Sequence, residues 1–155
     1  MEKTQKGFSL IELLIVVAII LVIAAIAIPS LLHAKMSGNE ASAVGSLHAI
    51  VSANQTYFST YGQGYPATLS ALGPAAVASS TAADLLDSQL TSGTKSGYTF
   101  VYSAAAPVGG IINSFSITAD PTMRGTSGQS SYYTDQTFVI RSNTATTASA
   151  GDSPI

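Results

Sequence analysis

The sequence contains no cysteine and few charged residues, and both absences narrow what the protein can be. Without cysteine there is no disulfide framework, no thiolate nucleophile and no thiolate metal site. Charged residues make up only 9% of the chain, against about 25% in an average soluble domain. The formal net charge is −2 at pH 7, so no basic surface is available to neutralise nucleic-acid phosphates. We therefore predict neither a disulfide-stabilised scaffold nor a nucleic-acid partner.

The apolar residues are concentrated in one block near the N-terminus. Residues 8–28 hold only two polar side chains, Ser9 and Glu12, while the rest of the chain is rich in serine, threonine, alanine and glycine. As a helix, this block spans roughly 30 Å at about 1.5 Å per residue, which is enough to cross a bilayer. Lys3 and Lys6 precede the block, so the positive-inside bias places the N-terminus in the cytoplasm and most of the chain outside.

Three interpretations of this block compete: a plain membrane anchor, a secretory signal peptide, and a prepilin leader followed by a retained helix. The signal-peptide interpretation has a small-residue cleavage pattern in its favour, Ala25-Ile26-Ala27. Glu12 argues against a plain anchor, because a carboxylate within lipid costs about 2.5–3.5 kcal/mol or more and by default marks a functional site. Composition and spacing alone leave all three interpretations open.

The segment from Gly7 to Pro29 resembles the N-terminal signature of type IV pilins and type II secretion pseudopilins. It reads Gly-Phe-Ser-Leu-Ile-Glu-Leu-Leu-Ile-Val-Val-Ala-Ile-Ile from residue 7 and closes with Ala-Ala-Ile-Ala-Ile-Pro. The resemblance implies that a prepilin peptidase cuts after Gly7 and removes residues 1–7 as a leader. It further implies that Phe8 becomes N-methylated, that Glu12 directs subunit assembly, and that residues 8–29 remain as a transmembrane and filament-core helix.

Cleavage would supply Glu12 with a charged partner. The new amine of Phe8 would lie four residues from Glu12 in the same helix, and in a staggered bundle Glu12 can instead meet the amine of a neighbouring subunit. Desolvation offsets much of the energy of such a pair, so we expect the pair to fix the stagger of neighbouring helices rather than to add much stability. Pro29 predicts a helix bend, because proline lacks a backbone N–H. Leu21 stands where many pilins have glycine, and the extent of any unwinding is therefore open.

Residues 30–155 are expected to hold the amphipathic half of the helix and a globular head. Apolar residues recur at spacings of three or four from residue 43 to residue 61, interrupted only by Asn54. This pattern predicts one helix over 9–61, with its aromatic residues in the core. A second helix is predicted over 82–90, because Thr81-Ala82-Ala83-Asp84 resembles a capping box.

Strand patterns follow in the C-terminal half of the chain. Residues 98–102 and 115–119 alternate apolar and polar, and 137–141 is rich in β-formers, with 132–134 as a candidate partner. Residues 142–155 are rich in serine, threonine and alanine and are predicted to be a loose surface tail. The predicted fold class is therefore α+β: a long N-terminal helix packed on a small antiparallel sheet, as in the type IV pilin fold that the resemblance implies.

No catalytic or metal-binding constellation is recognisable in the sequence. The two histidines, His33 and His48, are isolated from other possible ligands. Three acids are scattered along the chain: Asp120, Asp135 and Asp152. Asp84 and Asp87 are one turn apart and are explained by the favourable position of acids at a helix N-terminus. The match to an N-glycosylation sequon at Asn54 lies in mid-helix and is discounted. We expect no enzymatic activity, no metal and no cofactor.

The resemblance implies a structural role, that of the major subunit of a type IV pilus. Such a subunit is held in the bacterial inner membrane as a precursor and then polymerises into an extracellular filament for adhesion or motility. The implied partners are further copies of the chain, the prepilin peptidase, the inner-membrane pilus assembly platform and, before assembly, membrane lipid. The alternatives are a minor pilin, a type II secretion pseudopilin, or a membrane-anchored binding module.

Overall fold

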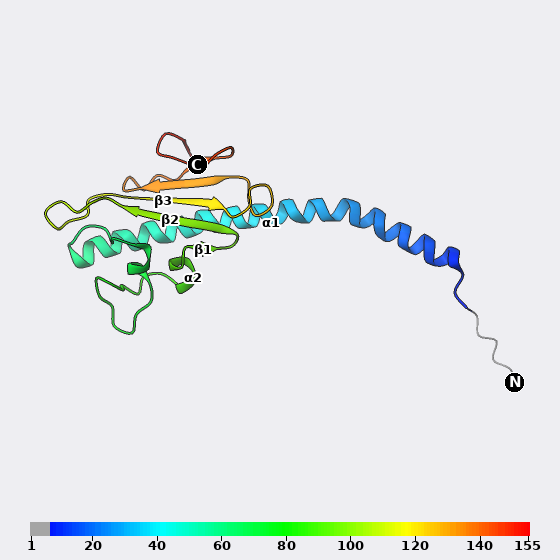
Figure 1. The fold of residues 1–155 in the computed structure, drawn as a ribbon, viewed down its shortest axis with the longest axis horizontal. Helices are drawn as coiled ribbons and strands as arrows, with labels where there is room; N and C mark the ends of the chain where they lie inside the picture. The colour runs from blue at the N-terminus through cyan, green and yellow to red at the C-terminus, as the bar shows by residue number, and fades with distance from the viewer. Residues whose placement is uncertain (1–6) are drawn as a thin grey trace. The chain divides into compact units, whose positions relative to one another are not determined.

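A computed structural model describes residues 7–155 of the chain (Figure 1). Of the predicted leader, residues 1–6 lie outside the described residues, and only Gly7 is described. The contacts divide the chain into two compact units, one ending at Lys35 and the other running from Met36 to Ile155. We refer to the second unit as the head.

Helix α1, Leu10–Tyr61, confirms the predicted helix over 9–61. Its residues as far as Ile28 are almost all apolar, and those beyond residue 42 are amphipathic, with seven buried in the head. The helix is continuous through Pro29, although proline has no N–H to donate to the carbonyl one turn earlier. The bend expected at Pro29 stays a prediction.

The head contains a six-stranded antiparallel sheet in which every strand pairs with the next along the chain. The longest pairing joins β2 and β3 over seven residues, and β4 pairs with β3 over four. The strands are β1 Thr94–Lys95, β2 Tyr98–Ala104, β3 Phe115–Pro121, β4 Ser131–Asp135, β5 Arg141–Asn143 and β6 Ser153–Pro154. This sheet and α1 confirm the predicted α+β class.

The core of the head forms between one face of α1 and one face of the sheet. Leu47 and Ile50 of α1 are fully buried with Tyr98 of β2 and Ile117 of β3. Burying a side chain of this size contributes about 1.5–3 kcal/mol relative to leaving it exposed. The three-to-four spacing in α1 and the alternation in β2 and β3 therefore serve the same core.

Asn54, the only polar break in the apolar stripe, is fully buried, and both polar atoms of its side chain have a hydrogen-bond partner. Its Nδ2 donates to the carbonyl of Ile50 at 2.9 Å, and its Oδ1 accepts from the hydroxyl of Tyr102 at 2.9 Å. Buried polar groups need such partners, because leaving one unsatisfied costs about 1–3 kcal/mol. Asn54 thus joins α1 to β2, and its burial agrees with discounting the sequon.

The second predicted helix is wrong over most of its length. Helix α2 covers only Ser88–Thr91, and Asp87 caps it by accepting from the backbone N–H of Leu90 at 2.8 Å. The residues before it bond to another segment instead: the N–H groups of residues 83–86 donate to the carbonyls of residues 71–73, at the end of the 3-10 helix η1, Leu69–Leu72. These tertiary hydrogen bonds replace the helical ones that the capping-box pattern predicted.

Two expectations for the C-terminal region are also corrected. The β-rich run 137–141 is not a strand before Arg141; Phe138 has a φ of 63°, a left-handed conformation that interrupts strand geometry. The predicted loose tail over residues 142–155 is wrong. Strands β5 and β6 of this segment belong to the sheet, and Ala148 is buried. Asp152 holds this segment by accepting from the backbone N–H of Ser149 and from Asn143.

Candidate assembly segment and other candidate sites

Gly7 and Phe8 precede α1 in an open position. The side chain of Phe8 is 89% exposed, and a Cβ placed on Gly7 would meet nothing within 4 Å. Within the described residues, nothing shields the peptide bond between these two residues. This bond is where the resemblance places the prepilin cleavage.

Glu12 caps its own helix. Its Oε2 accepts from the backbone N–H of Ser9 at 2.8 Å, and the carbonyl of Ser9 accepts from the N–H of Glu12 at 3.1 Å and of Leu13 at 3.3 Å. This is one half of a capping box, and a negative charge is favoured at the start of a helix. Sequence reasoning did not assign a role to Ser9, although Ser-x-x-Glu before an apolar run is a readable capping signal.

The cap leaves half of the Glu12 carboxylate available. Among the described residues, Oε1 of Glu12 has no hydrogen-bond partner. The structure therefore brings Glu12 to Ser9 rather than to Phe8, whose nitrogen is still a peptide nitrogen in the uncut chain. Since a carboxylate has two oxygens, Glu12 can keep its cap and also accept from an amine.

The apolar surface of α1 as far as Ile28 has no partner within the described chain. The fourteen leucine, isoleucine and valine side chains of this stretch are between 48% and 81% exposed. Among the described residues, α1 alone is long and apolar enough to cross a membrane. A contiguous apolar patch of this extent marks a membrane or protein interface, so this stretch needs lipid or another protein surface around it.

The remaining candidate residues do not form a catalytic or metal site. His33 and His48 are exposed, and no group of three or more potential ligands is placed to hold a metal within residues 7–155. Asp84 and Asp87 do not share a helix: Asp84 has a φ of 54°, while Asp87 caps α2 and pairs with Lys95 at 3.1 Å. The hydrogen bond from Leu90 and then that from Lys95 lower the pKa of Asp87.

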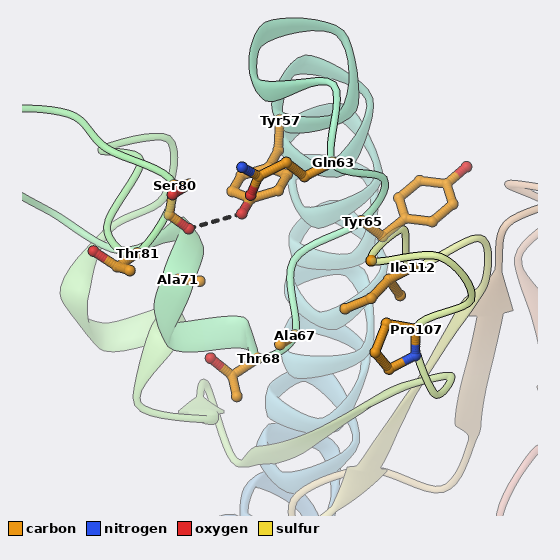
Figure 2. A pocket seen from close by; sticks show the side chains of 11 residues that line it. Tyr57, Gln63, Tyr65, Ala67, Thr68, Ala71, Ser80, Thr81, Pro107 and Ile112 are labelled. Atoms are coloured by element: carbon orange, nitrogen blue, oxygen red, sulfur yellow. Dashed lines mark hydrogen bonds between the residues drawn. The ribbon is translucent and has the colours of Figure 1, made fainter.

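The head has a cavity of about 420 Å³ beside the C-terminal end of α1 (Figure 2). Across it, the hydroxyl of Tyr57 donates to the carbonyl of Ser80 at 2.7 Å (Figure 2). Ile112 of the cavity wall forms a backbone bridge with Gly64, and a Cβ on Gly64 would overlap Ile112. No carboxylate, lysine, arginine or histidine side chain lines this cavity, and the titratable groups in its wall are the hydroxyls of Tyr57 and Tyr65, whose pKa values burial raises.

Comparison with known proteins agrees with the geometry of the N-terminal segment. Residues 3–28 match the family model described as the prokaryotic N-terminal methylation motif. The chain is 44% identical over 55 residues to the "Type IV wide pilus major component PilA4" of Thermus thermophilus, covering 36% of this chain and 42% of that protein. It is also 44% identical over 55 residues to the "Type IV major pilin protein PilA" of Myxococcus xanthus, covering 36% and 25%.

The match thus spans less than half the length of either relative. No solved structure matches the chain. The methylation motif includes Gly7, Phe8 and Glu12 together with the whole exposed apolar stretch of α1, Leu10 to Ile28. The chain therefore carries an N-terminal methylation motif of the prokaryotic type and is similar over 55 residues to two type IV pilins.

Proposed function

We propose that this protein is the major structural subunit of a type IV pilus rather than an enzyme. The observation that carries the proposal is the helical stretch from Leu10 to Ile28, which follows a cleavage-type glycine and is exposed along its whole length. A soluble monomer would not keep so much apolar surface in water. A filament of identical subunits covers this surface by packing the helices of neighbouring copies together.

The processing steps belong to the same proposal. A prepilin peptidase cuts between Gly7 and Phe8, residues 1–7 leave as the leader, and Phe8 is N-methylated. Residues 8–29 then form the membrane-held and later filament-core segment, while residues 30–155 provide the rest of α1 and the head. The openness of the Gly7–Phe8 bond supports this assignment, because a protease needs an unshielded peptide bond.

Glu12 and the new amine of Phe8 form the proposed assembly contact. Oε2 of Glu12 stays on the N–H of Ser9, and Oε1 accepts from the amine of a neighbouring subunit. The pair adds little net energy after desolvation, whereas a subunit with one member missing leaves an unpaired charge among apolar helices. The contact therefore selects the correct stagger, and the apolar side chains supply most of the association energy.

The proposed location follows from the same segment. The precursor lies in the inner membrane with its head outside the cytoplasm, where lipid covers the apolar stretch. An assembly platform in that membrane receives the cleaved subunit, and the subunit then passes into an extracellular filament that serves adhesion or motility. A minor pilin would share each step except abundance in the filament, whereas a type II secretion pseudopilin would share the processing and membrane steps but not the extracellular filament.

Mass spectrometry of filaments sheared from the cell surface tests the proposal. We expect this chain to account for nearly all of the filament mass, to begin at Phe8, and to carry one extra methyl group there. A processed chain that is present only in trace amounts would favour a minor pilin. A chain that is found only as membrane monomers would contradict the filament proposal.

A further inference from the structure

The face of the sheet opposite the core is polar where β2, β3 and β4 lie side by side. Phe100 of β2 and Ile117 of β3 point to the core and are buried, so the residues that alternate with them lie on the other face. On that face Ser103 pairs with Ser116, and Ser116 pairs with Asp135. The register therefore places two serine hydroxyls and one carboxylate in a single row across three strands.

This row forms part of a shallow hollow of about 290 Å³ in the head. Its lining combines the polar side chains of this row with those of Tyr133 and Gln136, and the rest of the wall comes from the ends of β2 and β3: Ala104, Ala105, Ser114 and Phe115. At this volume the hollow falls just below the roughly 300–1,000 Å³ of most ligand pockets, so it has room for one small ring at most. Unlike the cavity at the end of α1, it contains a carboxylate.

Several hydrogen-bonding groups of the hollow have no partner within residues 7–155. Ser103 and Gln136 are exposed and Ser116 is half-buried, so the two serine hydroxyls and the Gln136 amide face solvent and are free to bind a ligand. In contrast, the Oδ1 of Asp135 accepts from the N–H of Thr137 at 2.8 Å and from its hydroxyl at 2.6 Å. Its Oδ2 accepts only a long bond of 3.3 Å, from the hydroxyl of Tyr133. The turn after β4 thus fixes the carboxylate and leaves Oδ2 for a ligand.

We infer that this hollow binds the ring of a neutral saccharide. Adjacent hydroxyls of a sugar can donate to Oδ2 of Asp135 and exchange hydrogen bonds with the two serines and Gln136, while Tyr133 provides apolar surface for the C–H groups of the ring. The inference goes beyond the filament role and does not depend on it, because every group lies in the head.

The charge and donor set of the hollow disfavour other small ligands. An anionic ligand would meet the carboxylate of Asp135, and the one basic residue close by, Arg141 opposite Tyr133 on β5, is not among the lining residues. A calcium ion would need six to eight oxygen ligands, and only one lining residue carries a carboxylate. A neutral compound with several hydroxyl groups avoids repulsion from the carboxylate and does not need a full set of oxygen ligands.

Saturation-transfer NMR on the full chain in dodecylphosphocholine micelles tests the inference. The probes are the methyl glycosides of glucose, galactose and N-acetylglucosamine, with N-acetylneuraminic acid as an anionic comparison. We expect at least one neutral glycoside to bind and the anionic sugar not to bind. Asp135→Asn keeps an acceptor for Thr137 but removes the charge, and it should weaken binding about tenfold or more.

A matched pair of glutamine variants separates a local effect from a general one. Gln136→Ala removes one lining amide and should weaken binding about threefold to tenfold, whereas Gln55→Ala changes an exposed residue of α1 and should leave binding unchanged. Ser116→Ala gives a second lining variant that keeps the turn intact. Absence of binding by all three neutral probes, equal binding of N-acetylneuraminic acid, or equal effects of both glutamine variants would overturn the inference.

Discussion

The apolar stretch of α1 and the head deal with apolar surface in opposite ways. From Leu10 to Ile28, every leucine, isoleucine and valine side chain is at least 48% exposed. In the head, Leu47, Ile50 and Ile117 are fully buried within the same chain. The head completes its core alone, whereas the apolar stretch depends on lipid or on other subunits.

This difference separates two kinds of substitution effect. A change in the core of the head should alter the stability of a single chain, because its contacts are intramolecular. A change in the apolar stretch should alter association and leave the head as stable as before. Each prediction below changes one region and measures both quantities.

Glu12 should give the largest effect on assembly. Glu12→Ala removes both the cap on Ser9 and the proposed acceptor for the neighbouring amine, so we expect surface filaments to be lost while membrane insertion continues. Glu12→Gln is the matched variant, because it keeps an acceptor for Ser9 but has no charge, and it should also impair assembly. The measurement is the amount of subunit in sheared filaments relative to membranes; abundant Glu12→Ala filaments would contradict the assembly contact.

The same substitution placed in each region tests the comparison directly. Leu47→Ala removes a fully buried side chain of the head and should lower the free energy of unfolding by about 2–5 kcal/mol. Leu21→Ala removes a side chain that is 63% exposed and should leave that free energy unchanged. Denaturant titration in micelles, followed by the tyrosine signal of the head, measures the free energy of unfolding of both variants. Similar losses in the two variants would contradict the difference between the head and the apolar stretch.

Glu40 should have an intermediate effect, confined to the head. Its Oε1 accepts from the backbone N–H groups of Gln129 at 2.7 Å and Ser130 at 3.0 Å, and so joins α1 to the loop between β3 and β4. Glu40→Ala should cost about 1–2 kcal/mol, since such bonds to a charged group contribute at this level. Hydrogen exchange should accelerate at these two amides, while filament amounts fall much less than with Glu12→Ala.

Asp87 should give the smallest effect, and one that depends on pH. The pKa of Asp87 is lowered by the N–H of Leu90 and by Lys95, so its charged form is favoured in the folded head. A lowered folded pKa gives stability that is present above the unfolded value of about 4 and is lost as the pH falls through the folded pKa. Wild type and Asp87→Asn should thus differ slightly in melting temperature at pH 6 and converge near pH 2; an unchanging difference would contradict this.

The sequence predicted the elements that depend on local pattern. Helix α1 was predicted to within one residue, because an apolar run joined to a regular three-to-four spacing has few alternatives. The alternation around Phe100 and Ile117 likewise located β2 and β3. The capping contact between Ser9 and Glu12 was readable in the same local way but was not assigned.

Elements that depend on distant partners were predicted poorly. The segment before α2 has a helical pattern, yet its N–H groups bond to residues 71–73, which no local pattern indicates. Residues 142–155 have the composition of a loose tail, yet Asp152 and the pairing of β5 with β6 hold them in the head. The hollow around Asp135 depends on the register of three strands, and for that reason it could not be located from sequence alone.

Cysteine labelling in intact filaments tests the central claim most directly, because the chain has no cysteine of its own. Ile19→Cys places a thiol in the apolar stretch, and Thr147→Cys places one at an exposed position of the head. The account predicts that a water-soluble thiol reagent labels position 147 in filaments at once and labels position 19 only after the filaments are dissociated. Equal labelling of both positions in intact filaments would show that the apolar stretch is not covered by neighbouring subunits and would contradict the account.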